Sequence, residues 1–395
     1  MSNLARRRVL FVSHEASRTG APIVLLRFLR WLRANTSIDF EVVLRRGGEL
    51  AGEFADLAPV WHAEHGGGSF ARTTRRVAGR LGLTSVSDDR AVRRMVREMT
   101  RRGFGLVYSN TVTNGRLVAR LMELACPVLT HIHELESTIR RSGDENLALV
   151  KSQTTRYLAC AEAVKSNLIL RHSVDPDRID VVHGFVDVPD VDATLVAQAG
   201  ARVRSELGIP KDARVVGAAG TTNWAKSPDL FVQLAHAVHR KHPTRPVHFV
   251  WVGGGSPEDD RLADLRLDAE TAGVGHLVHF LGSRRDPTEY FCAFDVFALV
   301  SREDSYPLVC LEAASLAKPI LCFDRAGGER EFVEEDCGFV VPYLEVEAMC
   351  ERLLQLLDCD DLRQRMGHRA KTKVRERHST SVSAPLILHV MAELF

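Results

Sequence analysis

The segment of the chain best equipped for chemistry is a polar loop that leads into an apolar helical pattern starting near Pro307. The loop carries Asp304, and Glu312 follows eight positions later within the helical pattern. Proline is accepted in the first turn of a helix, and the unpaired backbone amides of that turn attract anions. The amides of Leu308 and Val309 are therefore expected to face an anionic ligand, and a diphosphate suits that geometry.

A second candidate segment joins a β-branched run to another helical pattern over residues 215–231. It contains Gly220, Thr221 and Lys226, and the lysine stands just before the helix. A lysine in that place is commonly a solvated surface residue. Its position after a strand and a glycine turn favours the alternative, a functional role.

Two loops of the N-terminal half also join a strand to a helix. In residues 13–23, Gly20 lets the backbone approach a ligand closely, and Pro22 can begin a helix whose dipole attracts an anion. In the other loop, Asn110 and Thr111 are suited either to contact an acceptor or to cap the helix that follows. The sequence leaves that choice open.

Two histidines stand near the end of a further apolar run, at His131 and His133. Their alternation places both on one face of a strand, where they could form a metal-binding pair. A zinc site needs at least three protein ligands, and no third ligand is visible at useful spacing. The sequence therefore favours a core histidine at His131.

Short β-branched runs alternate with helical patterns along the whole chain, which is the signature of parallel βα units. Strands are expected at 9–13, 40–44, 106–109, 128–132, 157–160 and 179–182, and again at 215–219, 247–252, 278–281, 296–300, 320–323 and 339–341. The prediction is therefore two doubly wound sheets in tandem.

A turn-rich passage near residue 190 separates the two sets of strands. The predicted division is an N-terminal domain over 1–190, a C-terminal domain over 191–377, and a helix over 378–395. Ligands of such sheets bind beyond the carboxyl ends of the strands, so the active site is expected in a cleft between the domains.

Taken in order along the chain, these motifs resemble glycosyltransferase family 4. The segment from Asp304 to Glu312 is similar to the family's signature, in which a carboxylate, seven residues and a glutamate precede a strand; aspartate stands here where the family usually has glutamate. The resemblance extends from Val9 to Val341. It implies the α/β fold called GT-B, with two Rossmann-like, doubly wound parallel-sheet domains facing each other across a cleft.

The resemblance implies that the domain over 1–190 binds the acceptor, that the domain over 191–377 binds the nucleotide sugar, and that the helix over 378–395 returns to the first domain. It also implies roles for individual residues. Asp304 is expected to bind hydroxyls of the transferred sugar, Glu312 the ribose of the nucleotide, and Lys226 the diphosphate, while Thr221 stands where the family has an arginine. By the same resemblance the catalytic residues are His133, Asp304 and Lys226; the donor-binding residues are Gly20, Gly220, Thr221, Lys226, Gly282, Tyr306, Leu308, Val309 and Glu312; and the acceptor-binding residues are Asn110 and Thr111.

The activity implied is the retaining transfer of a sugar from a UDP- or GDP-linked donor. The acceptor is expected to be a glycan, a lipid-linked molecule or a small molecule, in the synthesis of a cell-surface polysaccharide or glycoconjugate. Negative charge grows on the departing diphosphate, and Lys226 with nearby amides would stabilise it. Neither a metal ion nor another cofactor is expected.

Two other functions fit the same motifs. One is a GT-B sugar-nucleotide epimerase, and the other is a non-catalytic scaffold that binds a sugar nucleotide or a glycan. Thr221 and Asp304, as departures from the family pattern, are the features that favour a scaffold.

Composition limits the class of protein. The chain has 395 residues, 45% hydrophobic and 26% charged, which excludes a disordered or fibrous protein and favours two domains. Its eight cysteines include no Cys-x-x-Cys pair and fit a reducing compartment. The N-terminal arginines precede an apolar run too short for a signal peptide, so a cytoplasmic protein is expected.

The net charge of +1 hides a basic segment at residues 72–102, where ten arginines face only three acidic residues. This segment is suited to peripheral contact with anionic lipids at the inner membrane face or with a phosphorylated acceptor. An amphipathic helix with a solvated arginine face is an equally good interpretation. No nucleic-acid fold signature accompanies the charge, so nucleic-acid binding is not expected.

Overall fold

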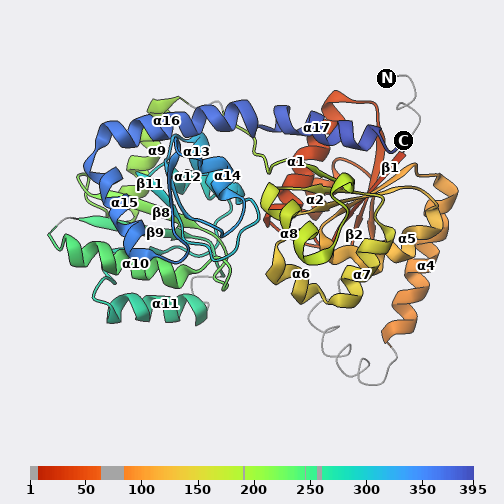
Figure 1. Ribbon diagram of the computed structural model, residues 1–395, viewed down its shortest axis with the longest axis horizontal. Coiled ribbons are helices and arrows are strands. Elements are labelled where there is room, and N and C mark those ends of the chain that lie inside the picture. The colour runs from red at the N-terminus through yellow and green to blue at the C-terminus, as the bar shows by residue number, and fades with distance from the viewer. Residues whose placement is uncertain (1–7, 64–83, 190–191, 245, 256–259) are drawn as a thin grey trace. The chain divides into compact units, whose positions relative to one another are not determined.

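The computed structural model describes residues 8–63, 84–189, 192–244, 246–255 and 260–395. The chain divides into two compact units (Figure 1): unit 1 comprises Met1–Gly184 and Thr380–Phe395, and unit 2 comprises Phe185–Ser379. The sequence analysis placed the boundaries at residues 190 and 377. Each unit is built around one parallel sheet with helices between its strands.

Unit 1 contains a seven-stranded sheet in the order β3-β2-β1-β4-β5-β6-β7. Its strands are β1 (Arg8–Ser13), β2 (Asp39–Leu44), β3 (Val60–His62), β4 (Leu106–Asn110), β5 (Val128–Ile132), β6 (Arg156–Ala159) and β7 (Ile179–Val181). Every pair is parallel. The chain leaves β1 in one direction along the sheet and β4 in the other. Right-handed crossovers then place helices on both faces.

The helices of unit 1 are α1 (Gly20–Asn35), α2 (Ala51–Ala55), α4 (Thr84–Arg102), α5 (Gly115–Leu121), α6 (Glu136–Ser142), α7 (Asp144–Gln153), α8 (Glu162–His172) and α17 (Thr380–Ala392), with 3₁₀ turns η2 (Val112–Asn114), η3 (Met122–Leu124) and η4 (Pro176–Arg178). The last helix, α17, contacts α1, beside which it lies in Figure 1. The last residues of the chain therefore complete the unit that contains the first strand.

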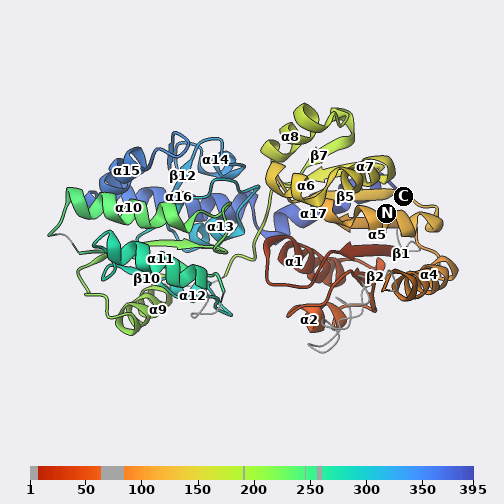
Figure 2. The same cartoon turned by 90° about the horizontal axis from the view of Figure 1, so that it is seen from below.

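Unit 2 contains a six-stranded parallel sheet in the order β10-β9-β8-β11-β12-β13. Its strands are β8 (Arg214–Ala219), β9 (Val247–Val252), β10 (Val278–Phe280), β11 (Val296–Leu299), β12 (Ile320–Phe323) and β13 (Gly338–Val341). Its helices are α9 (Ala193–Glu206), α10 (Pro228–Lys241), α11 (Asp260–Thr271), α12 (Thr288–Phe291), α13 (Leu308–Ser315), α14 (Glu329–Val333), α15 (Val346–Asp358) and α16 (Asp360–Arg377). Helix α10 contacts both α11 and α15 and lies between them in Figure 2.

The strands form where buried β-branched and aromatic residues run continuously, because both faces of a parallel sheet are covered. In unit 1, Phe11 lies fully buried between Phe28 and Phe40, with ring centroids 6.1 and 5.7 Å away. In unit 2, Phe231 of α10 packs on Phe249 and Trp251 of β9 at 5.4 and 5.6 Å. The prediction of two doubly wound parallel sheets is confirmed.

In both sheets the strand order reverses next to the first strand, between β1 and β4 and between β8 and β11. The carboxyl end of a sheet at such a reversal is where open α/β proteins bind ligands. All the candidate loops of the sequence analysis follow strands of these two sheets.

Candidate active site

The candidate site residues fall into two groups, one in each unit, and we call each group a half-site. The first half-site lies in unit 2, where the adjacent strands β8, β9 and β10 end in glycine turns. The amide of Gly220, after β8, donates to Val252 at 3.0 Å, and the amide of Gly253, after β9, donates to Gly282 at 2.9 Å. A Cβ on Gly253, which has φ 116°, would lie 2.4 Å from the Gly220 carbonyl oxygen. Glycine is needed for this close approach. Gly253 was not predicted, although a run of three glycines follows its strand.

The structure brings together Lys226 and Asp304, which are 78 positions apart. They form an ion pair in which the lysine side chain is 25% exposed and the aspartate side chain 8%. The same carboxylate oxygen accepts a hydrogen bond from Ser301 at 3.3 Å. Two of the three predicted catalytic residues therefore share one small region, and in the chain without ligands they bind each other.

The loop before α10 is held in one conformation by its own hydrogen bonds. The amide of Lys226 donates to the Asn223 side chain at 3.0 Å, and the Ser227 hydroxyl donates to the Trp224 carbonyl at 2.9 Å. Ser227 has φ 56° and also accepts from the amide of Arg302 at 3.1 Å. These contacts fix the lysine in front of α10. Thr221, the predicted substitute for an arginine, is exposed in this loop.

Arg302 anchors the carboxylate loop to α10 and was missed by the sequence analysis. Its guanidinium group donates to both carboxylate oxygens of Asp229, at 2.8 and 2.7 Å. Its carbonyl accepts from the Tyr343 hydroxyl at 3.1 Å. A bidentate pair of this kind adds geometric precision as well as energy. The anchor ties the two motifs that carry Lys226 and Asp304.

Helix α13 starts where expected, directly after Pro307. Leu308 is buried, whereas Val309 and Glu312 are half-buried. The described helix has no acidic residue in its first turn, so its amides remain suited to an anion. The Tyr306 side chain is buried with its hydroxyl 3.4 Å from the ring nitrogens of His378. Its predicted donor contact stays a prediction.

A carboxyl group that the sequence analysis did not single out lies beside this pair. Glu329, the first residue of α14, is 2% exposed, and neither of its side-chain oxygens has a hydrogen-bond partner within the described part of the chain. Burial, reinforced by the charge of Asp304, raises the pKa of Glu329 well above its ordinary value.

The second half-site lies in unit 1, at the ends of β1, β4 and β5. The Asn110 side-chain amide donates to the carbonyl of Ala21 in α1 at 2.9 Å, and its side-chain oxygen lies 2.9 Å from His133 Nε2. That geometry assigns the ring proton to Nε2. Asn110 therefore links His133 to the first turn of α1, where Gly20 is exposed and a Cβ would meet nothing within 4 Å.

Thr111 adopts a backbone conformation that is rare for a β-branched residue, with φ 113° and ψ 154°. Such a conformation costs of order 1–3 kcal/mol and persists only where its surroundings enforce it. The Thr111 amide donates to His131 at 2.8 Å, and the Glu134 carboxylate accepts from the amides of Val112 and His133 at 3.1 and 3.0 Å. Glu134, another residue that the sequence analysis missed, braces the turn.

Asn110 and Thr111 are fully buried. Their side chains hold β4, β5 and α1 together, and Thr111 caps the short turn η2 by accepting from the amide of Thr113. Of the two roles that the sequence left open, the structure displays the capping role. A contact with the acceptor stays a prediction for this pair.

Burial shifts the pKa values of the ionisable side chains in the unit 1 half-site toward their neutral forms. Burial lowers the pKa of His133 to about 3 and the pKa of His131 well below its ordinary value. Burial also raises the pKa of Glu134 to about 7. The Nδ1 atom of His131 lies 2.6 Å from the Tyr108 hydroxyl, a hydrogen bond expected of a core histidine. The other ring nitrogen, Nε2, has no hydrogen-bond partner among the described residues.

Family models of two kinds match the two units. Residues 18–189 match the family described as Glycosyltransferase Family 4, and residues 201–373 match the family described as Glycosyl transferases group 1. A relative from Corynebacterium glutamicum (strain R), named D-inositol 3-phosphate glycosyltransferase, is 30% identical over 300 residues, which cover 72% of this chain and 71% of that protein.

This chain belongs to glycosyltransferase family 4.

Similar proteins of the same name include one from Corynebacterium kroppenstedtii. It is 30% identical over 58% of this chain, and the match spans about half of the relative's own length, 51%. Among solved structures, Anabaena HepE in complex with UDP and glucose is similar with a TM-score of 0.79 at 18% identity, covering 98% of this chain and all of that one. The fold of this family 4 member is therefore GT-B.

The family resemblance gives the departures at two positions their structural context. Asp304 is one methylene shorter than the family's usual glutamate, and it pairs with Lys226 inside unit 2. Thr221 supplies a hydroxyl where the family has a positive charge, and it is exposed beside the glycine turn. The structure does not test the predicted ligand contacts of the individual residues, which stay predictions.

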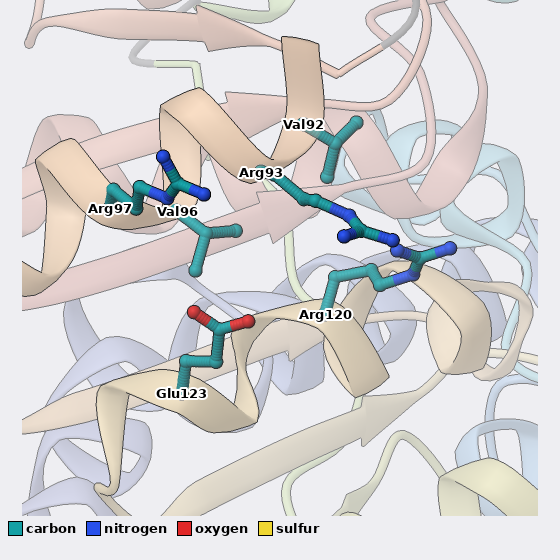
Figure 3. A pocket seen from close by; sticks show the side chains of 6 residues that line it. All are labelled: Val92, Arg93, Val96, Arg97, Arg120 and Glu123. Atoms are coloured by element: carbon teal, nitrogen blue, oxygen red, sulfur yellow. The ribbon is translucent and has the colours of Figure 1, made fainter. Parts of the chain in front are cut away.

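The basic segment predicted at residues 72–102 is described from residue 84 onward, within α4, and its first part lies outside the described residues. A cavity of about 290 Å³ opens between α4 and the α5–η3 segment (Figure 3), lined by Val92, Arg93, Val96, Arg97, Arg120 and Glu123. We call it the arginine groove. In the figure its arginine side chains reach from both elements toward the same space.

No helix in the described ranges is long and apolar enough to cross a membrane. Nor do the side chains of those ranges include a cluster of three or more histidine, cysteine, aspartate or glutamate residues suited to a metal ion. The expectation of metal-independent chemistry stays a prediction.

Proposed function

We propose that this family 4 protein is a retaining glycosyltransferase that moves a sugar from a nucleotide diphosphate sugar to a hydroxyl-bearing acceptor. The observation that carries the proposal is the pairing of Lys226 with Asp304 beside the first turn of α13. A cation, a carboxylate and free helix amides are what a sugar attached to a diphosphate requires. A surface lysine with a solvated role would not be 25% exposed and bound to a buried carboxylate.

The donor diphosphate would bind by taking the place of Asp304 as the partner of Lys226. A diphosphate carries more negative charge than Asp304, and the amides of Leu308 and Val309 reinforce its field at the helix end. Lys226 would then turn to the diphosphate, which leaves the Asp304 carboxylate to accept hydrogen bonds from sugar hydroxyls. Glu312, farther along α13, is expected to accept from the ribose.

During transfer the glycosidic bond to the diphosphate breaks, and negative charge grows on the departing oxygen. Lys226 and the amides of α13 would stabilise that charge, and preorganised contacts of this kind carry much of the rate enhancement in enzymes. The acceptor hydroxyl would pass its proton to the departing phosphate oxygen on the same face of the sugar, which retains the anomeric configuration. No side chain is needed as a covalent nucleophile.

His133 would orient a substrate hydroxyl as a neutral ring. Its Nε2 proton faces Asn110, so the Nδ1 atom is the hydrogen-bond acceptor of the ring. Because burial holds the pKa of His133 at about 3, the ring does not add charge at neutral pH. Its proposed task is positioning, whereas charge stabilisation belongs to Lys226.

Two observations support a UDP-linked donor and an acceptor that bears phosphate. HepE, which shares the fold, was solved with UDP and glucose, and with UDP-glucose. The relatives are named for D-inositol 3-phosphate. The arginine groove suits the phosphate of an acceptor or an anionic membrane surface, because Arg93, Arg97 and Arg120 outnumber Glu123 there. We propose a protein that acts in the cytoplasm and touches the inner membrane face peripherally.

The test is transfer by the purified chain. Thermal shift with UDP-, GDP- and ADP-sugars identifies the donor, since a ligand of the native state raises its melting temperature. The donor found is then incubated with phosphorylated polyols and glycan acceptors, and the product is identified by mass spectrometry and its anomeric configuration by NMR. Binding without hydrolysis or transfer would contradict the proposal and favour a scaffold. An inverted product would contradict the retaining mechanism.

A further inference from the structure

The most unusual buried group of unit 2 is the Glu329 carboxyl. It is 2% exposed, and both its oxygens lack a hydrogen-bond partner among the described residues. Buried polar groups in proteins are almost always paired, so an unpaired carboxyl demands a reason. Neither the proposed transfer reaction nor the family resemblance uses this residue.

Glu329 lies directly behind the Asp304 loop. Asp304 and Gly327 form a parallel bridge, in which the Asp304 amide donates to Ala326 at 2.9 Å and the Gly328 amide donates back to Asp304 at 3.3 Å. A Cβ on Gly327 would clash with the Asp304 carbonyl oxygen and lie 3.0 Å from a Glu329 carboxyl oxygen. The Glu329 side chain therefore folds back along Gly327 toward the residue that binds Lys226.

The ionisable groups around Glu329 explain its protonation state. Asp304 and Lys226 face it from the two donor loops, Glu331 from its own helix, and the thiols of Cys310 and Cys322 from α13 and β12. Burial raises the pKa of both thiols well above their ordinary value, so they add no charge. Desolvation and the Asp304 carboxylate outweigh Lys226, so the pKa of Glu329 lies well above its ordinary value. Enclosure without a hydrogen-bond partner among the described residues favours the neutral form of a carboxyl group.

We infer that Glu329 is a positioning residue of the donor half-site, whose neutral carboxyl leaves Asp304 as the single carboxylate that competes with the donor diphosphate for Lys226. An ionised Glu329 would place a second negative charge behind the pair. It would hold Lys226 toward the interior and repel the diphosphate. The inference rests on the proposed use of a nucleotide diphosphate donor by this site.

The experiment compares the full-length wild type with Glu329→Gln, a neutral residue of nearly the same shape. The probe is UDP-glucose, or whichever of the UDP-, GDP- and ADP-sugars binds the wild type, and its Kd and KM are followed from pH 6 to pH 10. In the wild type, affinity should fall by up to about tenfold for each pH unit above the point where Glu329 loses its proton, as one-proton linkage requires. In Glu329→Gln that decline should vanish, with Kd at pH 7 unchanged within about twofold.

Controls separate this role from a structural one. Glu331→Gln changes the neighbouring acid of the same helix and should keep the wild-type pH profile. A merely structural Glu329 would change stability but leave the alkaline decline of donor affinity intact in Glu329→Gln, and that result would overturn the inference. If Glu329→Gln does not fold, infrared difference spectra of the wild type decide: a protonated carboxyl band that persists at pH 7 and responds to the donor supports the inference, and its absence overturns it.

The outcomes for the two proposals differ. If the wild type binds none of the sugar nucleotides at any pH, the proposed function fails, and this inference fails with it. If the wild type binds and transfers while Glu329→Gln keeps the decline, only the inference about Glu329 fails.

Discussion

The two half-sites differ in the kind of electrostatics they offer. The half-site of unit 2 contains an ion pair, Lys226 with Asp304, beside a helix start that favours an anion. The half-site of unit 1 contains histidine rings whose pKa burial lowers and the Glu134 carboxyl, whose pKa burial raises to about 7. The Glu134 carboxyl accepts hydrogen bonds from two backbone amides. We propose from this contrast that charge stabilisation belongs to the residues of unit 2 and substrate orientation to those of unit 1.

The largest effect should come from removing the cation. Lys226→Ala is expected to reduce kcat/KM by roughly 10² to 10³, the scale for one preorganised electrostatic contact in a site. Asp304 would also lose its partner, so part of the loss should appear in stability. The matched control is Lys241→Ala, which removes a lysine paired with surface glutamates at the end of α10. An unchanged rate in Lys226→Ala would contradict the division of roles.

The next effect concerns His133. If the ring orients a hydroxyl without carrying charge, His133→Ala should lower kcat/KM by about 100-fold, the scale of losing substrate positioning. Because burial lowers the pKa of His133 to about 3, its protonated form is absent from pH 5 to pH 8. The pH dependence of the wild-type rate should then contain no titration step that is missing from His133→Ala. A limb near pH 6.5 that only the wild type displays would show that His133 acts as an acid or base.

A smaller effect on stability should come from Glu134. The folded pKa of about 7 lies above the ordinary 4.5, so the carboxyl is ionised in the unfolded chain at a pH where it is still protonated in the folded chain. Its cost to the fold therefore grows as the pH rises from about 4.5 to about 7 and then levels off. The melting temperature of Glu134→Gln should therefore rise relative to that of the wild type as the pH rises through that window. Equal pH dependence of the two melting temperatures would contradict the raised pKa.

The strands could be predicted because their apolar runs are buried on both faces, a pattern that is local in sequence. The exception is β3, whose three residues Val60–His62 are only partly buried at the sheet edge and form no such run. Residues 112–124 form η2, α5 and η3 in place of one continuous helix. Gly115 explains part of this, because a Cβ there would lie 2.5 Å from the Asn146 carbonyl oxygen, a contact that no local pattern encodes.

The candidate site could be predicted only as far as motifs allowed. Lys226 and Asp304 stand in separate motifs, and the prediction that both serve one ligand agrees with their ion pair. Glu329, Glu134 and Gly253 were missed because their importance arises from burial and close packing between distant loops. An acidic residue in a turn ordinarily signals a solvated surface, and only the folded chain reveals that Glu329 is enclosed.

The smallest effect should come from the backbone of Thr111, and its sign is diagnostic. At an ordinary position alanine is more stable than glycine by roughly 0.5–1 kcal/mol. At φ 113° the alanine Cβ retains the strain that glycine escapes, and both variants lose the same threonine hydroxyl. Thr111→Gly should therefore unfold with a free energy about 1 kcal/mol higher than Thr111→Ala, measured by urea denaturation. If alanine proves the more stable of the two, Thr111 is not strained, and the brace that Glu134 provides has no strain to hold.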